Sequence, residues 1–271
     1  MAQHFIIDQA EMDSCLTRYK VNCHKVIKQR RRTFLILAAF ERDAIDRFER
    51  SRKGETLPKL DLWATLSNLK PTKGTTNRPK GSEIKAAFRK FIAKEHGNIC
   101  CYCQRWLLNN GNAKPIEHIL PRESFQQYSF HFWNLAVACV DCNGLKKAKV
   151  WCDESKKDLK AYPSPSAFTE MFHPRFHRFK DHVRFIRVQT NDHSITLYQG
   201  ITLQGKKLCE DLLKDIAAKE ILVNGNSNLK DSLEIINQFE TDDSSELGAA
   251  MSNLQEALSN SAMKVLKNKQ A

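Results

Sequence analysis

The spacing of apolar residues predicts helices in the first hundred residues of this 271-residue chain. No Gly or Pro interrupts residues 8–53, and apolar positions such as Phe34, Ala38, Ile45 and Phe48 return at roughly helical intervals. We therefore predict that residues 8–53 are helical.

A second amphipathic helix is predicted between Ser82 and Gly97. Ser82 can cap its first turn, and Gly97 suits its C-terminal end. One apolar stripe runs along it, formed by Ile84, Ala87, Phe88, Phe91 and Ile92. The preceding residues 69–82 contain two Pro, two Gly and four basic residues, which is typical of a loop. We interpret this loop as a connector rather than a phosphate-binding arm.

The C-terminal part predicts two strands followed by helices. Residues 183–189 and 195–203 resemble strands joined by a turn, and helical spacing starts at residue 205. An acidic, Ser-rich break at 241–247 precedes a last polar helix. The pattern predicts an α+β fold with three regions. They are a helical, basic N-terminal region with a linker (1–81), a central core (82–155), and a C-terminal region with a β-hairpin followed by helices (156–271).

The positive charge is concentrated in one half of the chain. Residues 1–150 hold 27 basic and 14 acidic side chains, whereas residues 151–271 hold 16 and 17. Such a field favours a polyanionic partner, because neutralising phosphates releases counterions. A solvated basic surface is the alternative that charge alone leaves open.

Membrane association is not expected. The longest apolar run, residues 34–40, is far shorter than the ~20 residues that a membrane span needs. The first fourteen residues carry acids where a secretory signal would be basic. We expect a cytoplasmic location, where cysteines stay reduced and paired spacings indicate metal sites.

Two Cys-x-x-Cys pairs predict a structural zinc site. The pairs are separated by 35 residues, and their members are Cys100, Cys103, Cys139 and Cys142. Each pair can place two thiolates on one ion, and four thiolates leave no open position for a substrate. Cys101 should face elsewhere. The remaining cysteines, Cys15, Cys23, Cys152 and Cys209, are assigned no role.

Between the two pairs lies chemistry suited to phosphodiester hydrolysis. A neutral imidazole such as His118 can deprotonate water, and the carboxylate of Glu117 can bind a hard cation. Adjacent residues of a strand point to opposite faces, so the two side chains share one site only where the backbone turns. Pro121 is consistent with such a turn.

Residues 100–149 resemble the HNH nuclease motif of the ββα-metal (His-Me finger) superfamily. The resemblance is carried by Cys-x-Tyr-Cys, Glu-His-Ile-x-Pro, Asn-Leu and Cys-x-x-Cys-Asn with lysines after it. It implies a small ββα-metal core inside residues 82–155, with His118 as general base and Asn134 as the amide that braces the loop. It further implies Glu117 and Asn143 as ligands of catalytic Mg²⁺ or Mn²⁺, and contacts to nucleic acid from Lys146, Lys147 and Lys149.

The resulting hypothesis is a metal-dependent endonuclease that nicks or cleaves DNA. The layout is also similar to stand-alone HNH proteins of bacterial anti-phage defence, which implies a protein partner such as an ATPase or sensor. Two alternatives stay open: a catalytically inactive zinc-ribbon protein that binds nucleic acid, and an effector that cleaves RNA. His131 is assigned to aromatic packing, and a second metal pair at His173 and His177 is disfavoured by Pro174 between them.

Overall fold

The computed structural model describes residues 6–71, 78–107, 114–189 and 194–224 and has a mixed α+β fold, as predicted. Its N-terminal part forms four helices. They are α1 (Gln9–Asn22), α2 (Ile27–Arg52), α3 (Leu62–Ser67) and α4 (Gly81–Glu95). The predicted long helix is therefore divided by a break between Asn22 and Ile27.

Side-chain hydrogen bonds stabilise the break between α1 and α2. Arg30 Nε donates to the His24 carbonyl over 2.6 Å, and the Thr33 hydroxyl lies 2.8 Å from His24 Nε2. These contacts depend on polar groups several residues apart, so the apolar spacing of residues 8–53 did not reveal the break.

Helix α4 confirms the second predicted helix. It begins at Gly81, so its N-cap is Lys80 and not the predicted Ser82, and the Glu83 carboxylate accepts the Lys80 N–H over 2.8 Å. Most of the predicted apolar stripe is buried, and Gly97, with φ of +68°, follows the helix end. The short helix α3 was not predicted; its first turn is capped by Asp61, which accepts the backbone N–H groups of Trp63 and Ala64.

The central part is a short hairpin followed by a helix. Strand β1 (Ile116–His118) pairs antiparallel with β2 (Leu135–Val137), and Glu117 lies opposite Ala136. Helix α5 (Val140–Lys146) follows three residues after β2. Residues 119–134 connect the two strands through two short 3₁₀ turns.

A second hairpin and a helical segment form the C-terminal part. After the short helix α6 (Phe179–His182), strand β3 (Val183–Gln189) pairs with β4 (Ser194–Gly200), which confirms both predicted strands. Helices α7 (Leu203–Leu208) and α8 (Lys214–Asn224) are joined by a π-helical turn. The helices predicted after residue 224 lie outside the described residues.

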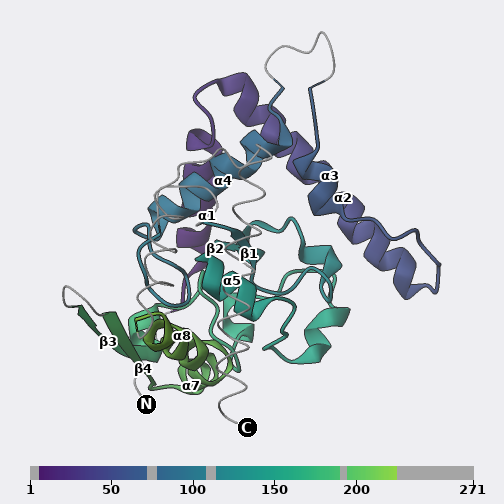
Figure 1. Ribbon diagram of the computed structural model, residues 1–271. Coiled ribbons are helices and arrows are strands. Elements are labelled where there is room, and N and C mark those ends of the chain that lie inside the picture. Colours follow the sequence, from purple (N-terminus) through teal and green to yellow (C-terminus); the bar gives the residue numbers. More distant parts are fainter. Residues whose placement is uncertain (1–5, 72–77, 108–113, 190–193, 225–271) are drawn as a thin grey trace.

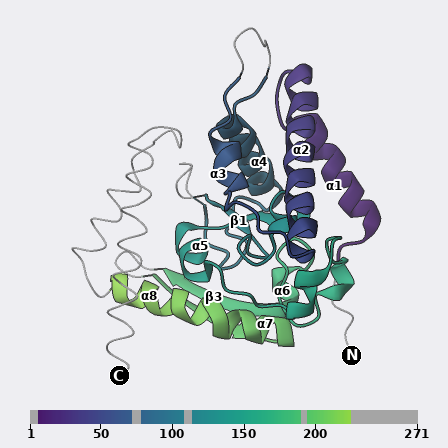
Figure 2. The same ribbon diagram turned by 90° about the vertical axis from the view of Figure 1, so that its right-hand side faces the viewer.

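The β1–β2 hairpin and α5 lie between two layers. Figures 1 and 2 show helices α1 to α4 on one side, and α7, α8 and the β3–β4 hairpin on the other. One buried cluster draws side chains from all three predicted regions, including Tyr19, Phe88, Trp133, Phe176 and Leu212. The division at residues 81 and 155 stays a prediction. No helix in the described part of the chain is both long and apolar enough to cross a bilayer.

Replacing Gly81 with Ala should destabilise the fold by about 2 kcal/mol or more, because its Cβ would lie 1.6 Å from the Leu66 carbonyl oxygen. Gly144→Ala is the matched control. Nothing lies within 4 Å of that Cβ position, so stability should stay unchanged or rise by ~0.5–1 kcal/mol. Urea denaturation measures both variants, and equal midpoints would contradict the close approach of α3 and α4.

Candidate functional site

The four paired cysteines converge as predicted. The sulfur atoms of Cys100, Cys103, Cys139 and Cys142 all lie within 4.8 Å of one another, and this is the one such ligand group in the described ranges. The sulfurs of Cys103 and Cys139 are 3.7 Å apart. Tetrahedral zinc with Zn–S bonds of 2.3 Å requires sulfurs about 3.8 Å apart. The cluster can therefore hold a metal ion such as zinc.

Local backbone geometry creates this convergence. After α4, the Cys100 N–H donates to the Arg105 carbonyl over 2.8 Å, which closes the first knuckle. The second knuckle forms the start of α5, where the Cys139 sulfur accepts the Cys142 N–H over 3.4 Å. The Cys139 N–H also donates to the Cys100 sulfur over 3.2 Å and so joins the two knuckles.

The cluster favours negative charge at one sulfur. Burial alone would raise the pKa of Cys100, but hydrogen bonds with the neighbouring thiols hold that pKa well below its ordinary value. Cys101 is buried beside the cluster without belonging to it, and burial raises its pKa. A thiolate in a buried four-sulfur group is a suitable ligand for a cation.

Basic side chains from distant parts of the chain surround the knuckles. Asp141, inside the second pair, forms ion pairs with Arg105 at 2.9 Å and with Lys219 of α8. Tyr198 of β4 donates to the Cys103 carbonyl over 2.8 Å. These contacts attach the C-terminal layer to the metal site. No local sequence pattern predicted these contacts, because their partners are more than 30 residues apart.

We expect the purified chain to contain one zinc ion. Cys139→Ser should lose the metal and lower the unfolding temperature, because metal binding and folding are coupled. Cys209→Ser, which changes a partly buried cysteine outside the cluster, should retain both. Elemental analysis and thermal unfolding provide the two readouts. A Cys139→Ser protein with full metal content and stability would rule out this zinc site.

His118 is held in one orientation at the end of β1. Its Nε2 lies 3.1 Å from the Ser129 carbonyl, which only accepts, so Nε2 carries the proton and Nδ1 keeps a lone pair. Trp63 packs edge-on against the imidazole, with ring centroids 4.8 Å apart. Burial, followed by the charge of Arg122, lowers the pKa of His118 to about 3. The ring is therefore neutral near pH 7.

The Asn134 amide forms hydrogen bonds with the loop that follows His118. Its side chain is fully buried, and its Oδ1 accepts the Leu120 N–H over 2.8 Å. Its Nδ2 donates to the carbonyls of Leu120 and Tyr128, both at 3.0 Å. The amide thus fixes both ends of the turn that positions the imidazole.

A buried chain of hydrogen bonds extends from Asn134 to the Pro- and His-rich segment. The Tyr162 hydroxyl lies 3.2 Å from Asn134 Oδ1 and 2.9 Å from His173 Nε2. His173 Nδ1 accepts the Arg175 N–H, so Nε2 carries the proton and Tyr162 donates to Asn134. His177 Nδ1 accepts the His173 N–H. The two histidines form hydrogen bonds instead of a metal pair, and sequence reasoning missed Tyr162.

Glu117 points toward α5. Its buried carboxylate lies 2.5 Å from Lys146 Nζ and accepts a hydrogen bond from Tyr102 over 3.3 Å. The same ammonium donates to the His118 carbonyl over 2.9 Å. The carboxylate hydrogen-bonds with Lys146 and Tyr102 rather than with the side chains of His118 or Asn143. Asn143 lies one turn before Lys146, at a spacing that places both on one helix face.

The structure corrects the interpretation of Lys146. Its side chain is fully buried, so it does not present its charge to a phosphate backbone. Helical spacing alone could not show that this lysine points inward against Glu117. Lys147 and Lys149 are exposed, and Lys149 Nζ donates to the Asp211 carbonyl over 3.3 Å. Their contact with nucleic acid stays a prediction.

Lys146→Met should destabilise the fold by about 3–5 kcal/mol, because it leaves the Glu117 carboxylate buried without a cation. The double variant with Glu117→Gln and Lys146→Met should recover most of that stability. Lys149→Met, at an exposed position of the same segment, serves as control. Denaturant unfolding of the wild type, both single variants of the pair, the double variant and the control measures the coupling. Additive losses in the double variant would show that the pair is not a unit.

Comparisons with known protein families, curated proteins and solved structures found no match to this chain. Its functional interpretation therefore depends on the chemistry and arrangement of the side chains described above.

Proposed function

We propose that this chain is a metal-dependent HNH endonuclease that hydrolyses phosphodiester bonds in DNA. The observation that carries the proposal is the orientation of His118, with Nε2–H bound to the Ser129 carbonyl and Nδ1 left to accept a proton. The order of β1, β2 and α5, with a cysteine pair before the hairpin and another at the start of the helix, also supports it.

His118 and Asn134 have different proposed roles in the hydrolysis. His118 Nδ1 takes a proton from water, and because the ring is neutral near pH 7 its lone pair is available. A general base works best with a pKa near the operating pH, so the negative charge of a bound phosphate would have to raise the pKa of His118 from about 3. Asn134 holds the loop and thereby the ring. Water attack on phosphorus and departure of the 3′-oxygen would give a 5′-phosphate and a 3′-hydroxyl. One such site acts on one strand, so cutting a duplex would need two chains or two successive nicks.

Glu117 and Asn143 are the proposed ligands of Mg²⁺ or Mn²⁺. The Lys146 ammonium on Glu117 shows that this buried carboxylate is already compensated by positive charge. A carboxylate oxygen and an amide oxygen are hard ligands of the kind that such an ion prefers. When bound, the ion would stabilise the negative charge that develops on the phosphate. Lys146 and Tyr102 both contact Glu117 Oε1, so the ion would bind through Oε2.

The buried Glu117–Lys146 pair also favours one alternative. If the adjacent ammonium keeps a second cation away from this carboxylate, the chain would be an inactive zinc-containing protein that binds nucleic acid. Cleavage of RNA is a further alternative, because the proposed chemistry needs no 2′-hydroxyl.

For the biological setting we propose anti-phage defence beside a partner such as an ATPase or sensor. Rapid, unrestrained degradation of DNA by the purified chain would remove the need for that partner.

A plasmid-nicking assay with and without Mg²⁺ or Mn²⁺ tests the activity. His118→Ala should reduce the rate by about 10³-fold, because the general base is lost, while DNA affinity is retained.

Asn143→Ala should raise the metal concentration needed for activity. Lys147→Ala should weaken DNA binding in a salt-dependent manner without a comparable loss of the chemical step. Metal-dependent cleavage that survives in His118→Ala would refute the assigned base, and absence of cleavage of either polymer would favour the inactive alternative.

A further inference from the structure

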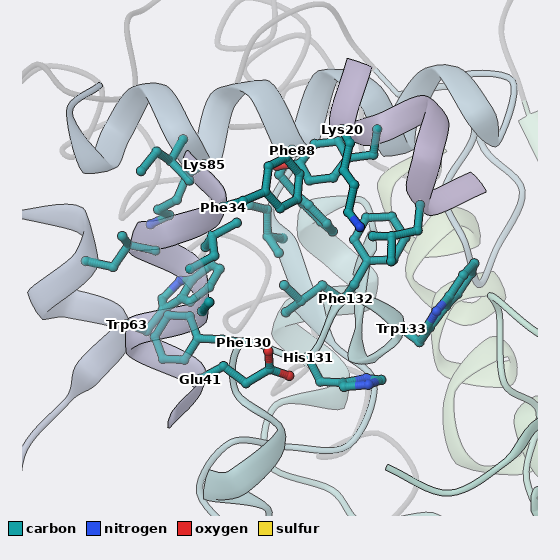
Figure 3. Close-up of a pocket in the computed structure, with 18 residues that line it drawn as sticks. Lys20, Phe34, Glu41, Trp63, Lys85, Phe88, Phe130, His131, Phe132 and Trp133 are labelled. Atoms are coloured by element: carbon teal, nitrogen blue, oxygen red, sulfur yellow. The ribbon is translucent and has the colours of Figure 1, made fainter. Parts of the chain in front are cut away.

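A cavity of about 260 Å³ lies between the N-terminal helices and the β1–β2 hairpin. Figure 3 shows aromatic side chains from α2, α3, α4 and the segment before β2 around it. Six of the rings that line it belong to Tyr19, Phe34, Trp63, Phe88, Phe132 and Trp133. Pockets for drug-sized ligands usually measure 300–1,000 Å³, so this volume suits a smaller, flat group.

Polar groups in the cavity distinguish it from a gap in the core. Glu41 of α2 extends its carboxylate toward Phe130 and His131 in Figure 3, and it hydrogen-bonds with none of the described residues. Burial raises the pKa of this carboxyl group. His131 Nδ1 is buried without a hydrogen-bond partner in the described part of the chain. An aliphatic ligand would offer the Glu41 carboxylate no hydrogen-bond donor.

The cavity adjoins the proposed catalytic base through Trp63. The same indole lines the cavity and packs against the His118 imidazole at a centroid distance of 4.8 Å. Lys85 Nζ lies 5.2 Å from the centre of the Trp63 ring, and Lys20 Nζ lies 6.0 Å from that of Phe34. A group that stacks on Trp63 would therefore lie beside the Lys85 ammonium and the His118 imidazole.

We propose that this cavity binds a nucleobase, with guanine as the best-matched base. Every base offers a π-face to aromatic walls. Guanine also presents two adjacent N–H donors, which match the two oxygens of the Glu41 carboxylate in a bidentate arrangement. The base can belong to a nucleic-acid strand or to a free nucleotide. The first source rests on the proposed nuclease function, and it would make an unstacked guanine beside the scissile phosphate the preferred substrate.

Tryptophan fluorescence of the full chain, without added divalent metal, measures binding separately from cleavage. The probes are guanosine 5′-monophosphate, the corresponding adenosine nucleotide, and short single strands that contain one guanine or none. Because Trp63 and Trp133 line the cavity, a stacked base should quench their emission. We expect the guanine-containing strand to bind most tightly.

Three variants test the assignment. Ala38→Trp places a large side chain at the cavity from an exposed position of α2 and should weaken binding at least about tenfold. Ala39→Trp is the matched control, because Ala39 is equally exposed and does not line the cavity. Glu41→Gln should remove most of the preference for guanine over adenine while the fold is retained.

The outcomes separate this inference from the nuclease proposal. If Ala38→Trp abolishes guanine binding, the result supports the cavity as the binding site even if no DNA is cleaved. Equal affinity for the free nucleotide and the strand would identify a free nucleotide as the ligand. Absence of quenching, or equal affinities in Ala38→Trp and Ala39→Trp, would overturn it even in an active nuclease.

Discussion

The convergence of four thiols on one point is the constraint on which the central region depends. The hairpin has only three residues in each strand, too few to be stable alone. The knuckle after α4 and the knuckle that opens α5 meet across 3.7 Å between Cys103 and Cys139, so both ends of the hairpin region are fixed at once. The C-terminal layer adds Tyr198 and Lys219 to the same two turns.

The second constraint is the need to satisfy buried polar groups. Asn134 sits in a fully buried position, where an amide without partners would be costly. The turn after His118 supplies partners through Leu120 and Tyr128, and Tyr162 completes the set. The orientation of the imidazole thus follows from a hydrogen-bond network that reaches the segment around His173.

Glu117 and His118 are neighbours in β1, but their side chains lie in different surroundings. Alternation along β1 turns the carboxylate toward α5 and the imidazole toward Trp63. Burial disfavours the charged form of both groups, so it raises the pKa of Glu117, against the opposing effect of Lys146, and lowers the pKa of His118. The proposed activity uses the imidazole in this orientation and would place a metal ion at the carboxylate on the other face.

The sequence by itself determined the parts whose signals are local. Regular spacing predicted α4 and the β3–β4 hairpin, and the two Cys-x-x-Cys pairs predicted the sulfur cluster, because each ligand pair is set by three residues of backbone. Tertiary structure decided the inward direction of Lys146, the hydrogen bond from Tyr162 to Asn134, and the aromatic cavity around Trp63. These depend on side chains from distant segments that meet only after packing. No local pattern predicts an ion pair between residues 29 positions apart, such as Lys146 and Glu117.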